Sequence, residues 1–394
     1  MGTYTVLDNG AVDAHIQAKL NLIVTRILKF IGAPNVKAII LSGGFGRGEG
    51  GVVINKKEIR LINDLDLTIV CHYSTYGKTI KEKKGPLEEL AQALAQEVDI
   101  KQVDLGLSHP ARFYLIANRV SDYEYVNGHK ILYGDIDIKK RSAKWLTFQN
   151  LPVEDGTNYF LTRGSGLLIA ALSFYDKSGI ALEDRENFLI ELNKAVLAMG
   201  DALLLLERKY HYSYQERLTA LDCVNFQQAP AGTTIKELYR KSLQWKLQPD
   251  IAWRGDDTEK QNWFYVRDLF DKFFFWFEQT RLSVNMKGWE EYLASIYGIQ
   301  GEFGVHFIKR IYKKIKNRSR RNDFGAKLAI MPGLLFSLNS DGSAEASLLN
   351  KSERNLSAFY HCEETCDWQE SVIAYLQVFH PGGVVKKVIN RDHG

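Results

Sequence analysis

Apolar residues recur at helical spacing near the start of the chain. Between residues 12 and 31 they fall three or four positions apart, and the run stops at Gly32-Ala33-Pro34. Such spacing places apolar side chains along one face of a helix, and a glycine followed by a proline is typical of a helix end. The pattern therefore predicts an amphipathic helix over residues 12–31.

Shorter segments rich in β-branched residues follow, with turn-forming residues between them. Proline is tolerated in the first turn of a helix, and Asn-Gly favours the tight turn of a hairpin. We therefore expect a helix from Pro86 to about Gln96 and a hairpin around Asn127-Gly128 with arms at 123–126 and 130–133. Apolar or alternating runs predict strands at residues 36–41, 65–71 and 102–107, and a hairpin at 52–62.

After residue 154 the strand patterns give way to helical ones. We expect this part to be mainly helical, with some irregular loops around residues 226–260 and 318–345. The fold class that follows is α/β (α+β): a domain with a mixed sheet at residues 1–154 and a mainly helical domain at 155–394. Helical periodicity recurs at residues 159–175, 184–209, 262–281, 287–297 and 303–317.

The composition narrows the class of protein only slightly. A hydrophobic fraction of 45% and a charged fraction of 25% fit a globular protein with a sizeable core. A formal net charge of +4 permits anionic substrates without requiring nucleic acid as a partner. No apolar run is long enough to span a membrane and no signal pattern opens the chain. We therefore expect a cytoplasmic protein without a membrane span.

The four cysteines are too scattered for a disulfide framework, which fits a reducing compartment. Cys362 and Cys366 lie four positions apart beside His361, which is half of a zinc site. No second pair completes that site, so zinc is not the favoured interpretation.

Asp64 and Asp66 flank a single apolar residue in a predicted strand. Residues i and i+2 of a strand point to the same face, so the two carboxylates share a face while Leu65 and Leu67 turn away. Two carboxylates a few ångströms apart repel each other unless a cation lies between them, and hard oxygen ligands suit Mg²⁺. A solvated strand end with two acids by chance is the competing interpretation.

A glycine-dense segment, Ser42 to Gly51, directly follows the predicted strand at 36–41. Glycines let the backbone approach closely and turn its N–H groups toward an anion, and Arg47 offers a charge-assisted contact to phosphate. A merely flexible surface loop would not need a predicted strand on each side. The segment is therefore a candidate anion-binding loop.

Gly43-Gly44 followed by Asp64-Leu65-Asp66 resembles the signature of the polymerase-β-like nucleotidyltransferase superfamily. That signature ends with a third acid on a neighbouring strand, which Asp104 matches better than Asp99, because Asp99 lies nearer the end of the preceding helix. The interval between Gly44 and Asp64 is longer than usual, which we attribute to an inserted hairpin. The resemblance covers about residues 36–135.

This resemblance implies a metal-dependent nucleotidyltransferase domain. Asp64 and Asp66 would hold one Mg²⁺ or Mn²⁺ at the triphosphate, and Asp104 would help to hold a second that lowers the pKa of the attacking hydroxyl. The phosphates would be bound at the turn formed by Ser42, Gly43 and Gly44.

The reaction implied is transfer of a nucleoside monophosphate, with AMP from ATP as the expected case, to a hydroxyl and with release of pyrophosphate. The acceptor stays open among a sugar or other small molecule, a protein, an RNA end and a second nucleotide. One alternative is a cyclic or oligonucleotide second-messenger synthase. Another is a catalytically idle nucleotide- or nucleic-acid-binding protein, against which the intact Asp64, Asp66 and glycine segment argue.

Other residues have two interpretations each. Lys194 lies in an apolar stretch with Asp201 seven positions on, and resembling enzymes often send a lysine from a second domain to the triphosphate. The alternative for Lys194 is an exposed position on an amphipathic helix. Tyr210, Tyr212, Tyr214 and Arg217 follow this helix and are candidates to face the same site.

A basic segment at residues 309–321 carries eight Lys and Arg residues beside an apolar stripe. It suits a polyanion or an anionic membrane surface, but a packed helix with a solvated basic face explains it as well. Nucleic acid is therefore a partner that we do not favour.

Two nucleotide-binding motifs also match in part. Gly46-x-Gly48-x-x-Gly51 fits a dinucleotide fingerprint, but a predicted hairpin rather than a helix follows it. The same stretch fits a kinase glycine loop, with Asp323-Phe324-Gly325 downstream, but no His-Arg-Asp catalytic loop precedes that triplet.

Overall fold

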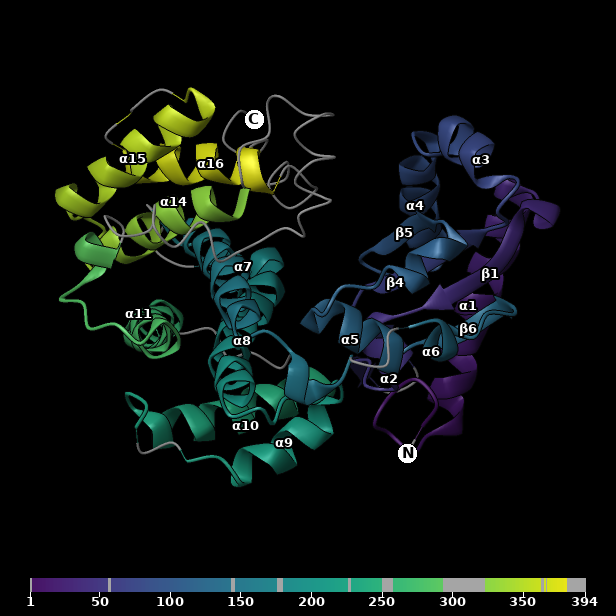
Figure 1. Cartoon of the computed structure of the whole chain (residues 1–394), viewed down its shortest axis with the longest axis horizontal. Coiled ribbons are helices and arrows are strands. Elements are labelled where there is room, and N and C mark those ends of the chain that lie inside the picture. The colour runs from purple at the N-terminus through teal and green to yellow at the C-terminus, as the bar shows by residue number, and fades with distance from the viewer. Residues whose placement is uncertain are drawn as a thin grey trace. The chain divides into compact units, whose positions relative to one another are not determined.

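The protein forms two compact units in the computed structural model (Figure 1). Unit 1 comprises Met1–Pro152 and two segments that return to it later in the chain, Glu207–Val224 and Leu243–Trp253. Unit 2 comprises Val153–Leu206, Asn225–Ser242 and Arg254–Gly394. The structure describes residues 2–55, 58–142, 146–175, 180–225, 228–249, 258–292, 323–362, 365 and 367–380.

A four-stranded mixed sheet in the order β5-β4-β1-β6 forms the centre of unit 1. Strand β4 pairs in parallel with β5 and antiparallel with β1, which in turn pairs antiparallel with β6. The mixed sheet expected from the sequence is thereby confirmed. The strands are β1 (Val36–Leu41), β4 (Leu65–Cys71), β5 (Val103–Ser108) and β6 (Lys130–Gly134).

One face of this sheet packs against two helices, α1 (Gly10–Ile31) and α4 (Pro86–Glu97). Buried residues of α1 recur every three or four positions, and they join alternate residues of β4, such as Leu65 and Leu67, in a single core cluster. Because side chains alternate along a strand, Asp66 points to the opposite face of the sheet. The hydrophobic core therefore fixes the face on which the acidic residues lie.

Further elements of unit 1 follow the strands. The predicted hairpin at 52–62 is confirmed as β2 (Val52–Asn55) and β3 (Glu58–Leu61), which pair with each other. The remaining helices are α2 (Gly43–Arg47), α3 (Tyr76–Lys83), α5 (Val120–Asn127), α6 (Ile138–Arg141) and α9 (Tyr214–Asp222), with 3₁₀ turns at Ala33–Asn35, Pro110–Tyr114 and Phe148–Asn150.

The predicted hairpin around Asn127-Gly128 is wrong in its first arm. Residues 123–126 belong to helix α5, whose buried residues Val120, Tyr123 and Val126 recur at the three-residue spacing of a helix. Gly128 has φ −119, which is not the positive value that a type I′ turn needs. A Cβ at Gly128 would lie 2.3 Å from Cγ of Arg47, so glycine is needed there for clearance.

The glycine-dense segment is also more ordered than a loop. Its first five residues form the single helical turn α2, which begins after Ser42 and ends at Gly48 in the left-handed region with φ 81. A residue with positive φ at a helix end is most readily a glycine. The local structure of this segment is therefore helix plus a glycine cap.

The described part of unit 2 is mainly helical, as expected, with an isolated β-bridge between Leu338 and Ala344. Some irregular loops were expected around residues 226–260 and 318–345, and much of both ranges is helical, because α10 (Gly232–Leu247) and α14 (Asp323–Ser337) lie there. The residues of the kinase-like triplet begin α14. The other long helices are α7 (Glu154–Leu172), α8 (Leu182–Leu206), α11 (Thr258–Leu282), α15 (Ala346–Tyr360) and α16 (Trp368–Phe379).

Aromatic rings fill much of the interior of unit 2. Phe160 of α7 stacks on Phe274 of α11 with ring centroids 4.5 Å apart, and it contacts Phe270 and Phe277 of the same helix. The proposed helix at 303–317, the basic segment 309–321 and Cys366 lie outside the described residues. Within the described helices, none combines the length and the apolar character that crossing a membrane requires.

Candidate active site

Three acidic residues come from the N-terminal ends of two neighbouring strands. Asp66 on β4 and Asp104 on β5 are register partners in the parallel pair, so their side chains lie next to each other on one face of the sheet. Asp64 directly precedes β4, and like Asp66 it is partly exposed, whereas Leu65 and Leu67 are buried. Asp64, Asp66 and Asp104 are called the acidic trio below.

The charged form of Asp66 is disfavoured by its surroundings in the trio. Burial, followed by the charges of Asp104 and then Asp64, raises the pKa of Asp66 to about 6. Arg47 and Lys246 oppose the shift but do not cancel it. A carboxyl whose pKa is raised by like charges has too little positive charge around it, and a bound cation would supply that charge.

Asp99, the alternative third acid, has a different place. It follows α4 with φ 50, in the left-handed region that lets the chain turn out of the helix. Asp104 lies inside β5 and accepts a hydrogen bond of 2.7 Å from Nε2 of Gln102. The structure therefore brings Asp104, and not Asp99, into register with Asp66.

The glycine turn packs directly on the acidic trio. A Cβ at Gly43 would lie 2.0 Å from Oδ2 of Asp66, and Gly43 has φ 67, so only glycine fits both the space and the backbone conformation. The Ser42 N–H donates to the backbone oxygen of Asp66 at 2.9 Å, and Ser42 Oγ lies 3.3 Å from the same oxygen. Ser42 and Gly43 are thus positioned by the strand that carries the acids.

Gly43 and Gly44 begin α2, and the first N–H groups of a helix have no partner within the helix. The Ser42 side chain does not cap them. The N–H groups of later glycines form hydrogen bonds within the protein. The Gly46 N–H donates to the backbone oxygen of Ser42, and the Gly50 N–H donates to that of Tyr4. The predicted anion contact is therefore better matched to Gly43 and Gly44 than to the whole segment.

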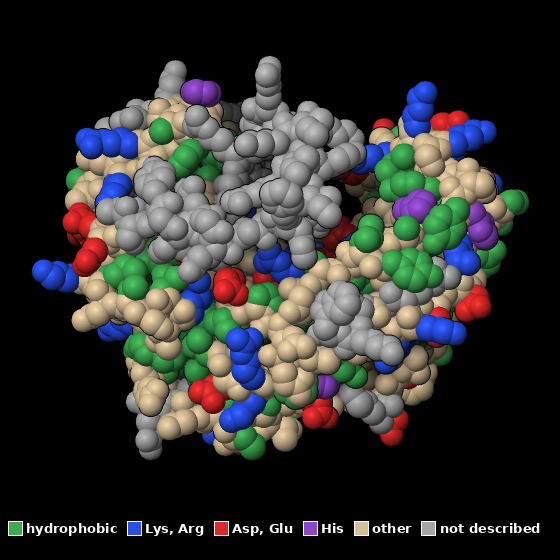
Figure 2. Space-filling model, viewed as in Figure 1, with side chains coloured by type: hydrophobic (Ala, Val, Ile, Leu, Met, Phe, Trp, Pro, Cys, Tyr) green, Lys and Arg blue, Asp and Glu red, His purple; other side chains and the backbone are tan. Residues whose placement is uncertain are grey.

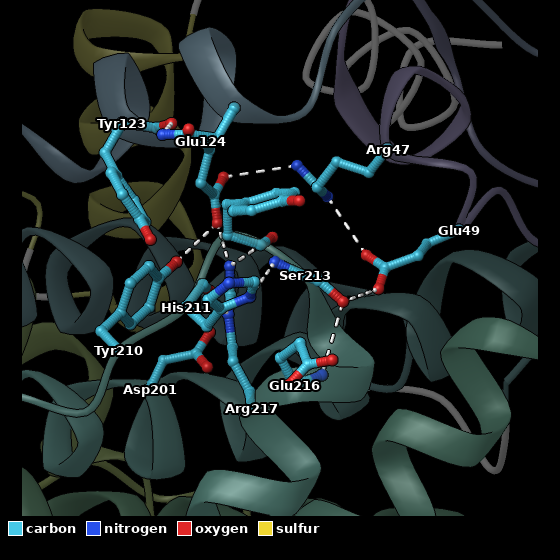
Figure 3. A network of polar contacts seen from close by, with 12 residues as sticks. Arg47, Glu49, Tyr123, Glu124, Asp201, Tyr210, His211, Ser213, Glu216 and Arg217 are labelled. Carbon is cyan, nitrogen blue, oxygen red and sulfur yellow. Dashed lines mark hydrogen bonds and ion pairs between the residues drawn. The ribbon is translucent and has the colours of Figure 1, made fainter. Parts of the chain in front are cut away.

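Arg47 lies in a buried polar network rather than at an open surface (Figure 3). Its Nε is 3.3 Å from Oε2 of Glu49, and its Nη1 is 3.5 Å from Oε2 of Glu124. Burial would lower the pKa of Arg47, but Glu124, Tyr214 and Glu49 together outweigh it and the pKa is raised. The structure thus gives Arg47 carboxylate partners within the protein, and the phosphate contact stays a prediction.

The residues proposed within and after α8 divide between the two units. Lys194 belongs to unit 2, where its Nζ forms an ion pair of 2.8 Å with Glu191 one helical turn away, and its side chain is 34% exposed. This position matches the amphipathic-helix interpretation, and the triphosphate contact stays a prediction. Tyr210, Tyr212, Tyr214 and Arg217 belong to unit 1.

The sequence pattern indicated no role for two further residues near the trio, Asn63 and Lys246. Asn63 Oδ1 accepts the Gly51 N–H at 2.6 Å, which connects the end of the glycine segment to the residue before Asp64. Lys246, in the second returning segment, lowers the pKa of Asp66, and its backbone oxygen would lie 2.8 Å from a Cβ at Gly51. Lys246 is distant in sequence, so no local pattern pointed to it.

The fit of a metal ion can be judged from the donors present. Across the part of the chain that the structure describes, no three His, Cys, Asp or Glu side chains form a group able to hold a metal by themselves. Mg²⁺, however, is commonly held by one or two carboxylates together with substrate phosphates. Adjacent carboxylates at Asp66 and Asp104, beside the first N–H groups of α2, fit that mode.

Surface charge is mixed on the face of the molecule drawn in Figure 2. Lys and Arg side chains alternate there with Asp and Glu side chains. Binding of nucleic acid depends on clustered cations that replace the counterions of phosphates. The described residues visible on this face do not form such a cluster.

Comparison with family models, with curated proteins and with solved structures found no match for this chain. The interpretation of the acidic trio therefore depends on its residues and their geometry.

Proposed function

We propose that this chain is a Mg²⁺- or Mn²⁺-dependent nucleotidyltransferase that moves a nucleoside monophosphate, AMP from ATP in the expected case, to a hydroxyl with release of pyrophosphate. The observation that carries the proposal is the convergence of Asp66 and Asp104, in register on parallel strands, with Gly43 packed on the Asp66 carboxylate. Such adjacent carboxylates are costly unless they serve to bind a cation.

In this proposal the acidic trio binds the divalent cation that accompanies the nucleotide. When bound, that cation polarises the phosphoryl group and lowers the pKa of the acceptor hydroxyl. The chain itself contributes fixed negative charge at Asp64, Asp66 and Asp104, and it contributes amide donors at Gly43 and Gly44 for the phosphate oxygens. Gln102 holds the carboxylate of Asp104 in one orientation through its 2.7 Å hydrogen bond.

Positions held rigidly before the substrate binds reduce the entropy that the reaction must lose. Asp66 is held at its backbone by Ser42, and Asn63 holds Gly51, so the acids and the glycine segment form one connected structure. This arrangement supports transfer between two bound reactants more than it supports simple nucleotide storage.

The test is incubation of the purified chain with each labelled nucleoside triphosphate and Mg²⁺ or Mn²⁺, with and without candidate acceptors, followed by separation of products by mass. We expect pyrophosphate release that requires the divalent cation and disappears in Asp66→Asn. A dinucleotide or cyclic product would identify a second-messenger synthase. Cation-dependent nucleotide binding without pyrophosphate release would identify a catalytically idle protein and contradict the proposal.

A further inference from the structure

A second group of charged residues lies at the other end of the glycine turn. Figure 3 shows the side chains of Arg47 and Glu49 meeting side chains from α5 and from the first returning segment. We call this group the Glu124 cluster; it consists of Arg47, Glu49, Glu124, Tyr210, Ser213 and Arg217. None of these residues belongs to the acidic trio, so the cluster needs an explanation of its own.

Glu124 is the centre of the cluster. Its carboxylate accepts hydrogen bonds from the Tyr210 hydroxyl at 2.5 Å and from Arg217, and it forms the ion pair with Arg47. Burial would raise the pKa of Glu124, but Arg217 and then Arg47 outweigh it, so the pKa lies below its ordinary value. Glu124 is therefore charged at neutral pH and matched to two cations.

Arg217 is fully buried and is held from several sides. Its guanidinium lies 4.1 Å from the ring centroid of Tyr210 and 4.2 Å from that of Tyr214, and its Nε donates to the backbone oxygen of His211 at 2.5 Å. A planar guanidinium suits this combination of stacking and directed hydrogen bonds, which an ammonium group cannot reproduce. The first returning segment thus presents a fixed cation to Glu124.

Glu49 joins the same segment to the glycine turn a second time. Its Oε1 accepts from Ser213 Oγ at 2.7 Å and from the Gln215 N–H at 3.2 Å, while its Oε2 faces Nε of Arg47. Arg47 is the last residue of α2, and Gly43, the first, packs on Asp66. The helical turn α2 is therefore held at one end by the acidic trio and at the other by the returning segment.

We infer that Glu124 and Arg217 are positioning residues, which act through Arg47 and Glu49 to fix the turn at Gly43 and Gly44 against Asp66. The inference deepens the proposed nucleotidyltransferase function and rests on it for its kinetic consequence. Fixing the turn before the nucleotide arrives lowers the ordering cost of binding the phosphates. A protein lacking these contacts would have to order the turn during binding.

The experiment compares Glu124→Gln with a matched change in unit 2, Glu278→Gln. Glu278 is a buried carboxylate that, like Glu124, accepts from a tyrosine, Tyr292 at 2.5 Å, and from an arginine, Arg281 at 2.6 Å. Both changes remove one charge and leave an arginine without its full counter-charge. Two quantities are measured in each full-length variant: amide hydrogen exchange of the peptide 43–51, and kcat and KM for ATP with Mg²⁺.

We expect Glu124→Gln to speed exchange of 43–51 at least tenfold and to raise KM for ATP at least tenfold, with kcat within threefold of wild type. Arg217→Lys should give an intermediate effect, because it keeps the charge but loses the planar contacts, and Arg217→Met should match Glu124→Gln. Glu278→Gln should change neither quantity. If Glu124→Gln does not fold, Arg217→Lys and Ser213→Ala, which removes one donor to Glu49, carry the same expectation of faster exchange at 43–51.

Unchanged exchange at 43–51 in these variants, or equal changes in Glu124→Gln and Glu278→Gln, would overturn the inference. The exchange measurement needs no activity. Wild-type protein that transfers no nucleotide while Glu124→Gln still loosens 43–51 would therefore contradict the proposed function alone. Active wild-type protein with an unaltered KM in Glu124→Gln would contradict the positioning role alone.

Discussion

Asp66 in unit 1 and Glu278 in unit 2 are two shielded carboxylates with opposite surroundings. Glu278 is fully buried and accepts from Thr157 at 2.5 Å as well as from Arg281 and Tyr292. Asp66 instead faces two further carboxylates, and its pKa is raised to about 6. The first carboxylate is matched by donors and a cation of its own unit, whereas the like charges around the second help to raise its pKa. Buried charge that the chain does not balance itself is a sign of a binding site.

The largest expected effect comes from removing the unbalanced charge at its centre. Asp66→Asn should lower turnover by about a thousandfold or more, because it removes electrostatic stabilisation where charge develops. Circular dichroism should show an unchanged fold, since the Asp66 carboxylate contributes no core contact. Turnover is measured as pyrophosphate release with Mg²⁺. A wild-type rate in this variant would contradict the catalytic role of Asp66.

The next largest effect distinguishes the two candidate third acids. Asp104→Asn should lower turnover by about a hundredfold, because Asp104 is the register partner of Asp66. Asp99→Asn is the matched control and should leave turnover nearly unchanged, because Asp99 lies in the turn after α4. The opposite ranking would move the candidate site five residues along the chain, from Asp104 to Asp99.

Glu278→Gln should act on stability and not on catalysis. Removing one partner of a buried ion pair leaves the other charge uncompensated and costs about 3–5 kcal/mol. Urea denaturation followed by intrinsic fluorescence would measure the loss in the free energy of unfolding. Turnover per folded molecule should match wild type. A loss of turnover without a loss of stability would mean that the comparison with Asp66 is mistaken.

A smaller effect should appear in the pH dependence of the folding stability of the cation-free protein. The pKa of Asp66 is higher in the folded state than in the unfolded chain, so the folded state binds more protons between about pH 4 and pH 6. Stability from this group is therefore present below about pH 4 and is lost as the pH rises through about 6.

Asp66→Asn should abolish this fall in folding stability with rising pH. It should therefore stabilise the cation-free protein at pH 7 by roughly 1–3 kcal/mol relative to wild type. Thermal melts in chelator at several pH values measure it. Mg²⁺ should reduce the difference in thermal stability between Asp66→Asn and wild type, because it stabilises only the wild type. Equal dependence of stability on pH in the two proteins would show that folding does not raise the pKa of Asp66.

The smallest effect is expected from the basic segment. Changing Lys313, Lys314 and Arg318 together to Ser should leave turnover close to wild type if the acceptor is a small molecule or a nucleotide. A polyanion acceptor would instead show affinity that falls steeply with salt, with a slope near −0.7 to −0.9 per phosphate contact. Tight binding of RNA or DNA that is lost in the triple variant would favour a nucleic-acid acceptor.

Local patterns were sufficient for the elements whose own residues decide them. The helix at 12–31 has its apolar stripe in the sequence, and the strands at 36–41 and 65–71 are apolar runs that a sheet must bury. For this helix and these strands the physical cause lies within a few residues of the feature. The place of Asp104 beside Asp66 was expected only from the resemblance to the nucleotidyltransferase signature, which has a third acid on a neighbouring strand.

The glycines show where local reasoning failed. Gly128 was interpreted as a hairpin residue, but its role is to clear the side chain of Arg47, which is far away in the sequence. The sequence also did not show that Glu49 and Glu124 lie around Arg47, whose phosphate contact stays a prediction. Whether an arginine meets a carboxylate of its own chain depends on tertiary packing, which a sequence pattern of one segment does not contain.

The sequence by itself determined the acid-apolar-acid strand, the glycine turn before it and the change to helices after residue 154. Only the tertiary structure decided that residues 207–224 and 243–253 return to unit 1, where Lys246 lowers the pKa of Asp66 and Arg217 joins the Glu124 cluster. Periodicity records which face of an element is buried, and it is a local property. Which distant segment covers that face is decided by the packing of the whole chain, because many segments offer similar apolar surfaces and only their combined fit selects one.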